Sequence, residues 1–253
     1  MLRKLILFVL YVPTILWAQT SYGVVNYSTM DYEHGKNVHE VRSIASITKL
    51  FTAKTVIDSG VSMSQEIKVQ GKSSGRFARG VMIERYELLR AMLMSSDNLA
   101  AESLAHAHPG GYEKFLKDTA ENISEMNLKD TVIVDSTGLL AGNQSSVNDL
   151  KEFLFTLRKY HIIQLLSSEK LYTYEYRRGK KTIKVHMKNT NPQMWTYDNI
   201  ILTKTGFTNA AGRCLAMLVE KNNELYAVIS LGNKTLFQRS KNITELMNEI
   251  GDR

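Results

Sequence analysis

Cysteine and proline are scarce in this chain of 253 residues, which contains one Cys and three Pro. Because Cys214 has no partner within the chain, an intrachain disulfide is excluded. Its position in the apolar run CLAMLV predicts a buried structural thiol rather than a nucleophile. The prolines form no cluster that would mark a linker between two domains.

Histidine is also rare, and the six residues of this type are scattered along the sequence. His106 and His108 are two positions apart, a spacing that does not place two ligands on the same face of a helix. We therefore expect neither a metal site nor a cofactor in this protein.

The charge balance is mildly basic, with 32 Lys and Arg against 25 Asp and Glu and a formal net charge of +7. We find no dense run of Lys and Arg with interleaved aromatic residues, so nucleic acid is not an expected partner. The positive excess could favour attraction to an anionic polymer or surface. A basic but otherwise ordinary exported protein is the simpler explanation.

The N-terminal segment differs in character from the rest of the chain. It begins with the basic MLRK, continues as the apolar run LILFVLYVPTILW, and has no acidic residue before Asp31. Since the run is shorter than the ~20 residues of a membrane span, it predicts a secretory signal peptide of residues 1–18. An uncleaved anchor is the alternative, because Leu16 is large for its position near the expected cut.

Hydrophobic periodicity predicts strands near both ends of the chain and helices between them. Residues 22–38 are predicted to form a hairpin, with GVVNYS as a strand and DYEHGKN as the turn. IILTKTG, CLAMLVEK and LYAVISLG predict three later strands, of which the last two are joined by NNE. Helices are expected at residues 46–58, 86–94, 99–107, 112–127 and 147–157, and around Ile243, Leu246, Met247 and Ile250.

The order of these elements predicts a single domain made of two lobes. Strands from the two ends have to share one sheet, so the block between them is an insertion. Within a domain of residues 19–253, we place the sheet lobe at about 19–60 and 195–253, and an all-helical lobe at about 61–194. The fold class is α/β (α+β), and a cleft between the lobes is the expected position of a functional site.

A serine and a lysine interrupt the apolar pattern of RSIASITKLFTAK. Ser46 and Lys49 are three residues apart, so on a helix their Cβ atoms would lie about 5 to 6 Å apart on one face. If apolar neighbours keep the amine neutral, it can take the serine proton and create a nucleophile. Chance is the alternative, because Ser167 and Lys170 repeat the same spacing.

The stretch SSDNLAA places polar residues between two expected helices. The Ser96 hydroxyl could relay a proton there, and the Asn98 amide could hold a peptide group of a substrate. The alternative is helix capping by Ser, Asp or Asn. Ser146 and Asn148 show the same spacing, and we interpret that pair as a cap.

A third polar group lies at the end of an expected strand, in LTKTGFTNAAGRC. Lys204 and the Thr205 hydroxyl could bind a substrate carboxylate, and Gly206 would let a peptide approach the strand edge. An ordinary lysine on an edge strand is the alternative interpretation.

The three motifs occur in the order SxxK, SDN and KTG that penicillin-recognising serine enzymes share. IASITKLFTA, LLRAMLMSSDNLAAESLA, HPGGYEKF, DSTGL and LTKTGFTNAAGRCLAM resemble the D-alanyl-D-alanine carboxypeptidase and endopeptidase family of low-molecular-mass penicillin-binding proteins. Within it, the likeness is greatest to murein DD-endopeptidases of the penicillin-binding protein 7 type. The resemblance covers about residues 22–250 and implies a β-lactamase/transpeptidase-like fold with an antiparallel sheet flanked by helices.

The resemblance also implies a role for each motif. Ser46 would be the acylated nucleophile, Lys49 its general base, and Ser96 a proton shuttle, with Asn98 binding substrate. The backbone N–H groups of Ser46 and Phe207 would form the oxyanion hole. The reaction would be a two-step acyl transfer on the D-alanyl bonds of peptidoglycan stem peptides, and β-lactams would trap the serine.

The third motif would bind substrate through Lys204, Thr205 and Gly206. We also expect three cationic side chains near the serine, namely Lys49, Lys204 and Arg213. Repulsion between them would help keep Lys49, the base, neutral. No metal or cofactor is implied by the resemblance.

Four functions remain open at this point. A DD-endopeptidase that cuts peptidoglycan cross-links is favoured, and a D-alanyl-D-alanine carboxypeptidase is the first alternative. A class A-type β-lactamase would need a deacylating glutamate in a pattern such as ExxLN before the third motif, and we find none between Ser96 and Lys204. The last is a non-enzymatic penicillin or muropeptide sensor. The expected location is the periplasm, with no stable membrane span once the signal is cleaved.

Overall fold

A computed structural model of the chain describes residues 20–250. The expected signal peptide of residues 1–18 lies outside the described residues, so it stays a prediction. Within residues 20–250, no helix is both long and apolar enough to cross a membrane.

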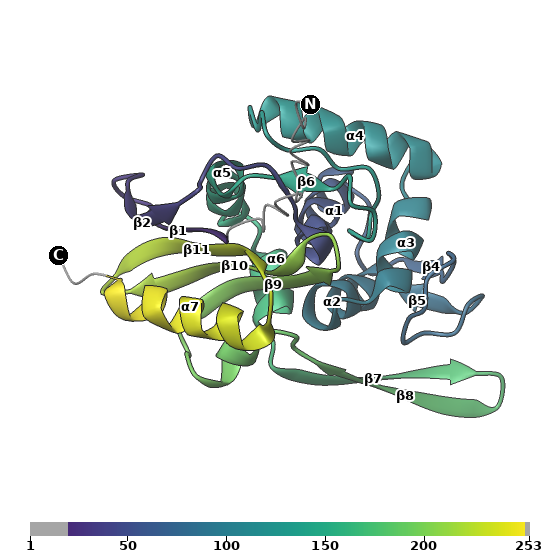
Figure 1. The fold of residues 1–253 in the computed structure, drawn as a ribbon. Helices are drawn as coiled ribbons and strands as arrows, with labels where there is room; N and C mark the ends of the chain where they lie inside the picture. Colours follow the sequence, from purple (N-terminus) through teal and green to yellow (C-terminus); the bar gives the residue numbers. More distant parts are fainter. Residues whose placement is uncertain (1–19, 251–253) are drawn as a thin grey trace, which may run out of the picture.

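An antiparallel sheet of five strands in the order β2-β1-β11-β10-β9 forms the core of the structure (Figure 1). The prediction that the two ends of the chain share one sheet is therefore confirmed, since N-terminal β1 pairs with C-terminal β11. The predicted NNE turn also forms, with Asn222 and Asn223 at positive φ, as a tight hairpin requires. The strands are β1 Ser21–Asn26, β2 Tyr32–Lys36, β9 Ile200–Thr208, β10 Gly212–Lys221 and β11 Glu224–Asn233.

The first hairpin turns earlier than predicted. We expected DYEHGKN to be the turn, but Tyr32–Lys36 within it forms strand β2, and the chain reverses over residues 27–31. Met30, at φ 61°, donates its N–H to the Asn26 carbonyl at 2.9 Å to close the turn. As an edge strand, β2 has little apolar surface to bury, so its sequence carries little alternation.

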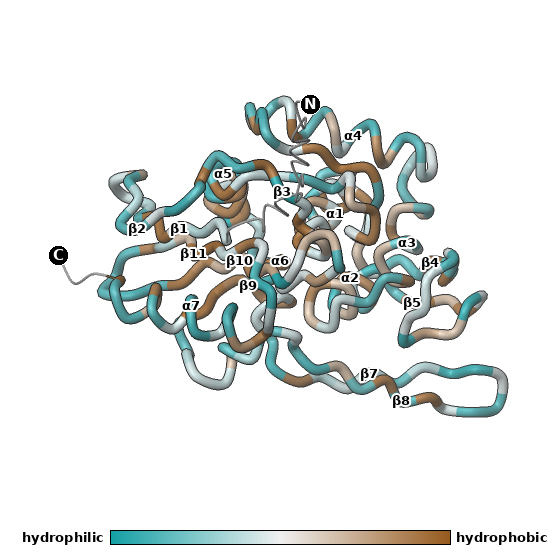
Figure 2. Tube along the Cα trace, viewed as in Figure 1, coloured by the Kyte–Doolittle hydropathy of each residue, from teal (hydrophilic) through white to brown (hydrophobic). Residues whose placement is uncertain are grey.

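Helices cover both faces of the sheet. On one face, α7 (Leu236–Glu249) buries Ile243, Leu246 and Met247 against strand residues that include Leu215, which confirms the predicted stripe. On the other face, α5 and α6 pack on β11 and β9. Figure 2 shows the hydrophobic residues concentrated along the central strands and the helices beside them.

The block between the two halves of the sheet is mainly helical, and the helices predicted there are present within a residue or two. They are η1 Ala45–Ile47, α1 Thr48–Asp58, α2 Arg85–Ser95, α3 Asn98–His106, α4 Gly111–Glu125 and α5 Val147–Leu157. Helix α6 His161–Ser168 was not predicted. The exact division into lobes stays a prediction.

The expectation of an all-helical block is wrong in one respect, because this block also contains strands. Two of them, β7 and β8, form a long hairpin that projects from the body of the molecule (Figure 1). Its outward side chains are polar, so a search for apolar runs did not detect it. The strands within the block are β4 Glu66–Lys68, β5 Met82–Glu84, β6 Gln144–Ser145, β7 Leu171–Arg178 and β8 Lys181–Lys188. A short strand before the block, β3 Arg42–Ser43, pairs with β6.

A stacked pair of phenylalanines joins α1 to α5. Phe51 and Phe153 have ring centroids 3.7 Å apart with planes 7° from parallel, and both side chains are buried. We expect Phe51→Ala to lower the free energy of unfolding by about 3–5 kcal/mol, because it leaves a cavity in the core. Phe237→Ala is the control, since this side chain is 79% exposed. It should change the free energy of unfolding by less than about 0.5 kcal/mol. Urea denaturation measures both, and equal midpoints would contradict the assignment of Phe51 to the core.

Candidate active site

Two other chain segments, at Gly138 and Gly206, pack closely against the backbone around Ser46. Ser46 lies in η1, immediately before α1, and the preceding Ala45 has a φ of 47°. A Cβ on Gly206 of β9 would lie 2.9 Å from the Ser46 nitrogen, and one on Gly138 would lie 2.0 Å from the Ala45 carbonyl oxygen. Glycine at both positions therefore lets two chain segments pack directly on the serine backbone.

Lys49 is fully buried one turn beyond Ser46. Its Nζ lies 3.0 Å from Ser46 Oγ, 2.7 Å from Asn98 Oδ1 and 2.5 Å from the Thr137 carbonyl oxygen. A neutral amine has two N–H donors and one lone pair, so it can donate to the amide and carbonyl oxygens and accept from the serine hydroxyl. A protonated amine has three donors and no acceptor. The three oxygens would satisfy a protonated amine, and a neutral amine donating to Asn98 and Thr137 would keep its lone pair for the serine proton.

Burial is what makes Lys49 a base near neutral pH. Desolvation lowers its pKa from 10.5 to about 7, while the carboxylates of Asp135, Asp97 and Glu102 oppose this shift. The expectation that Lys204 and Arg213 keep Lys49 neutral is not supported, because the charges with the largest effects on it are acidic. Lys49 does lower the pKa of Lys204.

The SDN motif combines the two interpretations considered for it. Asp97 is a helix cap, and its carboxylate accepts the Ala100 N–H at 2.8 Å at the start of α3. Ser96 adopts a left-handed conformation, with φ 57°, at the end of α2. Ser96 and Asn98 both line the same cleft as Ser46. The middle residue is thus structural, whereas its two neighbours face the site.

Strand β9 brings the KTG motif to the same place. Lys204 is buried, and its pKa is held well below its ordinary value, first by desolvation and then by Lys49 and Arg239. Thr205 is bound to Thr190 through their hydroxyl oxygens, 2.6 Å apart. Phe207 follows at the cleft mouth and is 51% exposed.

The cleft has a volume of about 700 Å³ and exposes residues that the sequence did not single out. Arg239 on α7 is one of them, and burial, followed by repulsion from Arg213, lowers its pKa to about 10. Lys188 at the end of β8 and Trp195 also line it. Arg239 lies on the buried face of α7, four residues before Ile243, and a single charged residue at the start of an apolar stripe did not single it out.

A second feature missed from the sequence is the loop that follows Asp135. Burial opposes the charge on this carboxylate, but hydrogen bonds from Thr137, Leu140 and Asn143 keep its pKa below the ordinary value. The same oxygens accept the Thr137 N–H at 2.5 Å and the Gly138 N–H at 2.7 Å. Asp135 thereby fixes the loop whose carbonyl contacts Lys49. The motif DSTGL was the available signal.

The other polar patterns in the sequence have ordinary structural explanations. The second serine-lysine pair is not brought together, since Ser167 is buried while the Lys170 amine contacts exposed Asp198 at 2.9 Å. Ser146 caps α5, as predicted, by accepting the Asp149 N–H at 3.1 Å. The Cys214 thiol is buried, as predicted, and desolvation raises its pKa to about 11.

The site has the features of a class of enzymes in which a lysine activates a serine nucleophile: a serine hydroxyl at the cleft with a buried lysine amine 3.0 Å from its oxygen. Residues 17–235 match the family model of D-alanyl-D-alanine carboxypeptidase. The chain belongs to this family of serine DD-peptidases.

Similarity to individual proteins agrees with the family. The chain is 36% identical over 222 residues to a D-alanyl-D-alanine endopeptidase of Escherichia coli, which covers 84% of this chain and 70% of that protein. It is also 36% identical to a D-alanyl-D-alanine endopeptidase of Pseudomonas aeruginosa, over 77% of this chain and 64% of the relative. In fold, it matches the Streptomyces K15 DD-transpeptidase with a TM-score of 0.84 and 22% identity, over 94% and 97% of the two chains.

Alanine substitutions at two glycines with similar backbone conformations distinguish the effect of backbone strain alone from the effect of displacing the active-site backbone. Gly60 and Gly138 have φ of 69° and 82°, but a Cβ on Gly60 would meet open space. We expect Gly60→Ala to cost about 1–2 kcal/mol and to leave acylation of Ser46 by a fluorescent penicillin unchanged. Gly138→Ala should displace the Ala45 carbonyl and slow acylation by tenfold or more. Equal acylation rates in the two variants would show that this contact does not position the serine.

Proposed function

We propose that this chain is a DD-endopeptidase that cuts D-alanyl cross-links of peptidoglycan through an acyl-enzyme on Ser46. The observation that carries the proposal is the buried Lys49 amine, with a pKa of about 7, 3.0 Å from the Ser46 hydroxyl oxygen. The choice of endopeptidase is supported by the names of the two relatives with 36% identity. A carboxypeptidase that removes a terminal D-alanine is the alternative, and the family description supports it.

In the proposed first step, Lys49 takes the serine proton as Ser46 Oγ attacks the carbonyl carbon of the D-alanyl bond. The backbone N–H groups of Ser46 and Phe207 would stabilise the oxyanion. The C–N bond then breaks, and the proton passes from Lys49 to the leaving amine, with Ser96 as the relay. In the second step, Lys49 takes a proton from water as the water oxygen attacks the ester carbonyl carbon. The bond from this carbon to Ser46 Oγ then breaks, Lys49 returns the proton to Oγ, and the acid product leaves.

Substrate binding is assigned to the remaining cleft residues. Asn98 would hold a peptide group of the stem, and Gly206 would let the substrate run along β9. We assign Lys204, Thr205 and Arg239 to a substrate carboxylate. Thr205 and Arg239 line the cleft, and buried Lys204 lies close enough to Lys49 and Arg239 for both to lower its pKa. The contact between Lys49 and Asn98 Oδ1 links the binding amide to the base.

The structure gives a reason to prefer a peptidase over a β-lactamase. Rapid hydrolysis of a penicillin ester needs a carboxylate that is free to activate water. Asp135 is near the base, but its oxygens already accept hydrogen bonds from Thr137, Leu140 and Asn143. We propose that β-lactams trap Ser46 as slowly released esters, and that the protein acts in the periplasm after export.

The lysine base predicts a specific pH dependence. Because the folded-state pKa of Lys49 is lowered to about 7, the amine is protonated and inactive below this pH and neutral above it. The rate of Ser46 acylation should rise about tenfold per pH unit up to pH 7 and then level off. Lys49→Arg should lose acylation by at least about 100-fold at every pH, because arginine stays protonated. Stopped-flow measurement with a fluorescent penicillin checks both, and a flat profile from pH 5 to 9 would refute lysine as the base.

The reaction itself is tested with defined muropeptides. We expect the intact protein to convert cross-linked muropeptide dimers to monomers and Ser46→Ala to leave them intact, as read by mass spectrometry. Loss of a terminal alanine from pentapeptide monomers, with dimers unchanged, would establish the carboxypeptidase instead. A stable penicillin adduct with no cleavage of either substrate would indicate a sensor.

A further inference from the structure

The hairpin β7–β8 has two different faces. Strand register places Tyr172, Tyr174 and Tyr176 opposite Met187, Val185 and Ile183, and these residues are buried or half-buried. Phe77 packs on this inner face, with its ring 6.1 Å from that of Tyr174 and 5.8 Å from that of Tyr176. The inner face therefore attaches the hairpin to the body of the protein.

The outer face is exposed along its whole length and carries cations. On β8, alternate residues Lys188, His186 and Lys184 point outward, and each is about 7 Å from the next along the strand. Arg177 on β7 continues the same face toward the tip. We call these four residues, together with Lys180 in the turn, the cationic track.

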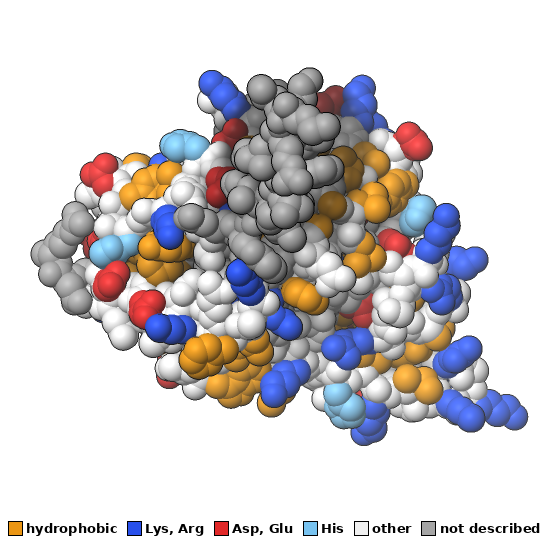
Figure 3. Space-filling view, viewed as in Figure 1, with side chains coloured by type: hydrophobic (Ala, Val, Ile, Leu, Met, Phe, Trp, Pro, Cys, Tyr) orange, Lys and Arg blue, Asp and Glu red, His pale blue; other side chains and the backbone are white. Residues whose placement is uncertain are grey.

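The hairpin accounts for most of the formal net charge of the chain. Residues 171–188 contain six Lys and Arg and one acid, Glu175, so they contribute +5 to a formal net charge of +7. Glu175 contacts Lys184 at 2.8 Å, and both side chains are about half exposed or more. Figure 3 shows Lys and Arg side chains gathered over the projecting hairpin. The stretch YTYEYRRGKK has four Lys and Arg in five positions beside three tyrosines, so the expectation that the chain has no dense basic run near aromatic residues is wrong.

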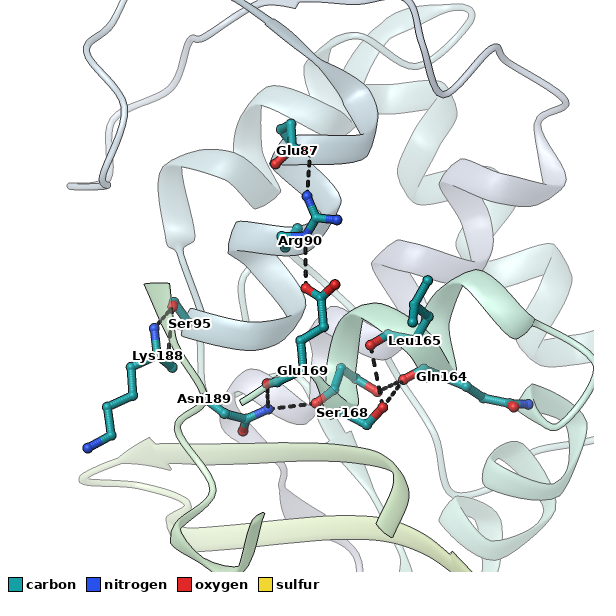
Figure 4. A network of polar contacts seen from close by, with 10 residues as sticks. Glu87, Arg90, Ser95, Gln164, Leu165, Ser168, Glu169, Lys188 and Asn189 are labelled. Carbon is teal, nitrogen blue, oxygen red and sulfur yellow. Dashed lines mark hydrogen bonds and ion pairs between the residues drawn. The ribbon is translucent and has the colours of Figure 1, made fainter. Parts of the chain in front are cut away.

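The base of the hairpin is fixed to helix α2, which ends next to the SDN motif (Figure 4). Ser95, next to Ser96, exchanges hydrogen bonds with the backbone of Lys188 at 3.0 and 3.1 Å. Arg90 contacts Glu169 at 2.8 Å and stacks 3.7 Å from the centre of the Tyr172 ring. Lys188 itself lines the cleft above Ser46. The cationic track therefore begins at the cleft and leads away from it.

We propose that the cationic track binds the carboxylate-bearing peptide stems of a peptidoglycan strand whose cross-link lies in the cleft. This inference rests on the proposed function and adds a binding surface outside the catalytic residues. Two observations carry it, the complementary charge of a linear polyanion and the continuity of the track with the cleft lining. The track would raise the local concentration of polymer at Ser46 and hold it there between cuts.

Other anionic partners fit this surface less well. A nucleic acid would need aromatic side chains on which bases can stack, but the hairpin tyrosines lie on the inner face against Phe77. A membrane surface would contact only the cations at the tip of the hairpin and not those near the cleft. A track that starts at Lys188 in the cleft matches a strand that passes through the active site.

The experiment compares two triple variants, each made in the Ser46→Ala protein so that the polymer is not cut. The first, Arg177→Gln/Lys180→Gln/Lys184→Gln, removes three charges from the track. The control, Lys117→Gln/Lys129→Gln/Lys241→Gln, removes three exposed charges outside the hairpin. Binding to purified peptidoglycan sacculi is measured by cosedimentation at several salt concentrations. We expect the track variant to bind about tenfold more weakly at low salt, with a flatter salt dependence, and the control to stay within about twofold of the parent.

The outcomes separate this inference from the proposed function. Equal loss in both triple variants would show that only net charge matters, and no loss in either would also overturn the track. Vesicles of phosphatidylglycerol and phosphatidylethanolamine form a second arm, and a loss confined to vesicles would assign the hairpin to a membrane instead. With Ser46 intact, penicillin acylation of the track variant checks folding. If the protein cuts muropeptide dimers but the track variant binds sacculi as well as the parent does, the inference about the track fails while the proposed function stands. If binding needs the track but no muropeptide is cut, the proposed function fails.

Discussion

The burial of one amine governs the architecture of this site. Lys49 has no exposed surface, and a charged ammonium without solvent would be costly unless it were paired. The protein supplies two oxygen acceptors, from Asn98 and Thr137, and a hydroxyl from Ser46. This arrangement satisfies a neutral amine, so the same desolvation that lowers the pKa also prepares the base for catalysis.

That one requirement explains why distant segments converge. The acceptors for Lys49 come from the start of α3 and from the loop after Asp135, so both must be positioned accurately. Asp97 fixes the first by capping α3, and its other oxygen accepts the Arg76 N–H at 2.6 Å. Asp135 fixes the second by accepting several hydrogen bonds within its own loop. These carboxylates act on the base through the backbone they hold.

The sequence predicts those features of the fold and site that require particular residue types at particular positions. The motifs around Ser46, Ser96 and Lys204 were recognisable, as were the helices whose apolar residues recur with helical period. The Thr137 carbonyl was not predictable as a contact, because any residue provides such an oxygen. Arg239 was hidden among polar helix residues, and strand β2 was mistaken for a turn because edge strands need no apolar alternation.

Basic groups at the cleft disfavour one another's protonation. Lys49 and Arg239 lower the pKa of Lys204, and Arg213 lowers that of Arg239. An entering carboxylate would relieve this repulsion, so binding an anionic stem peptide is favoured before any bond is made at Ser46. The same carboxylate would tend to raise the pKa of Lys49, which places a limit on how close it can lie. Holding much of the polymer charge at the solvated hairpin, away from the base, resolves this conflict between attracting an anion and keeping a lysine neutral.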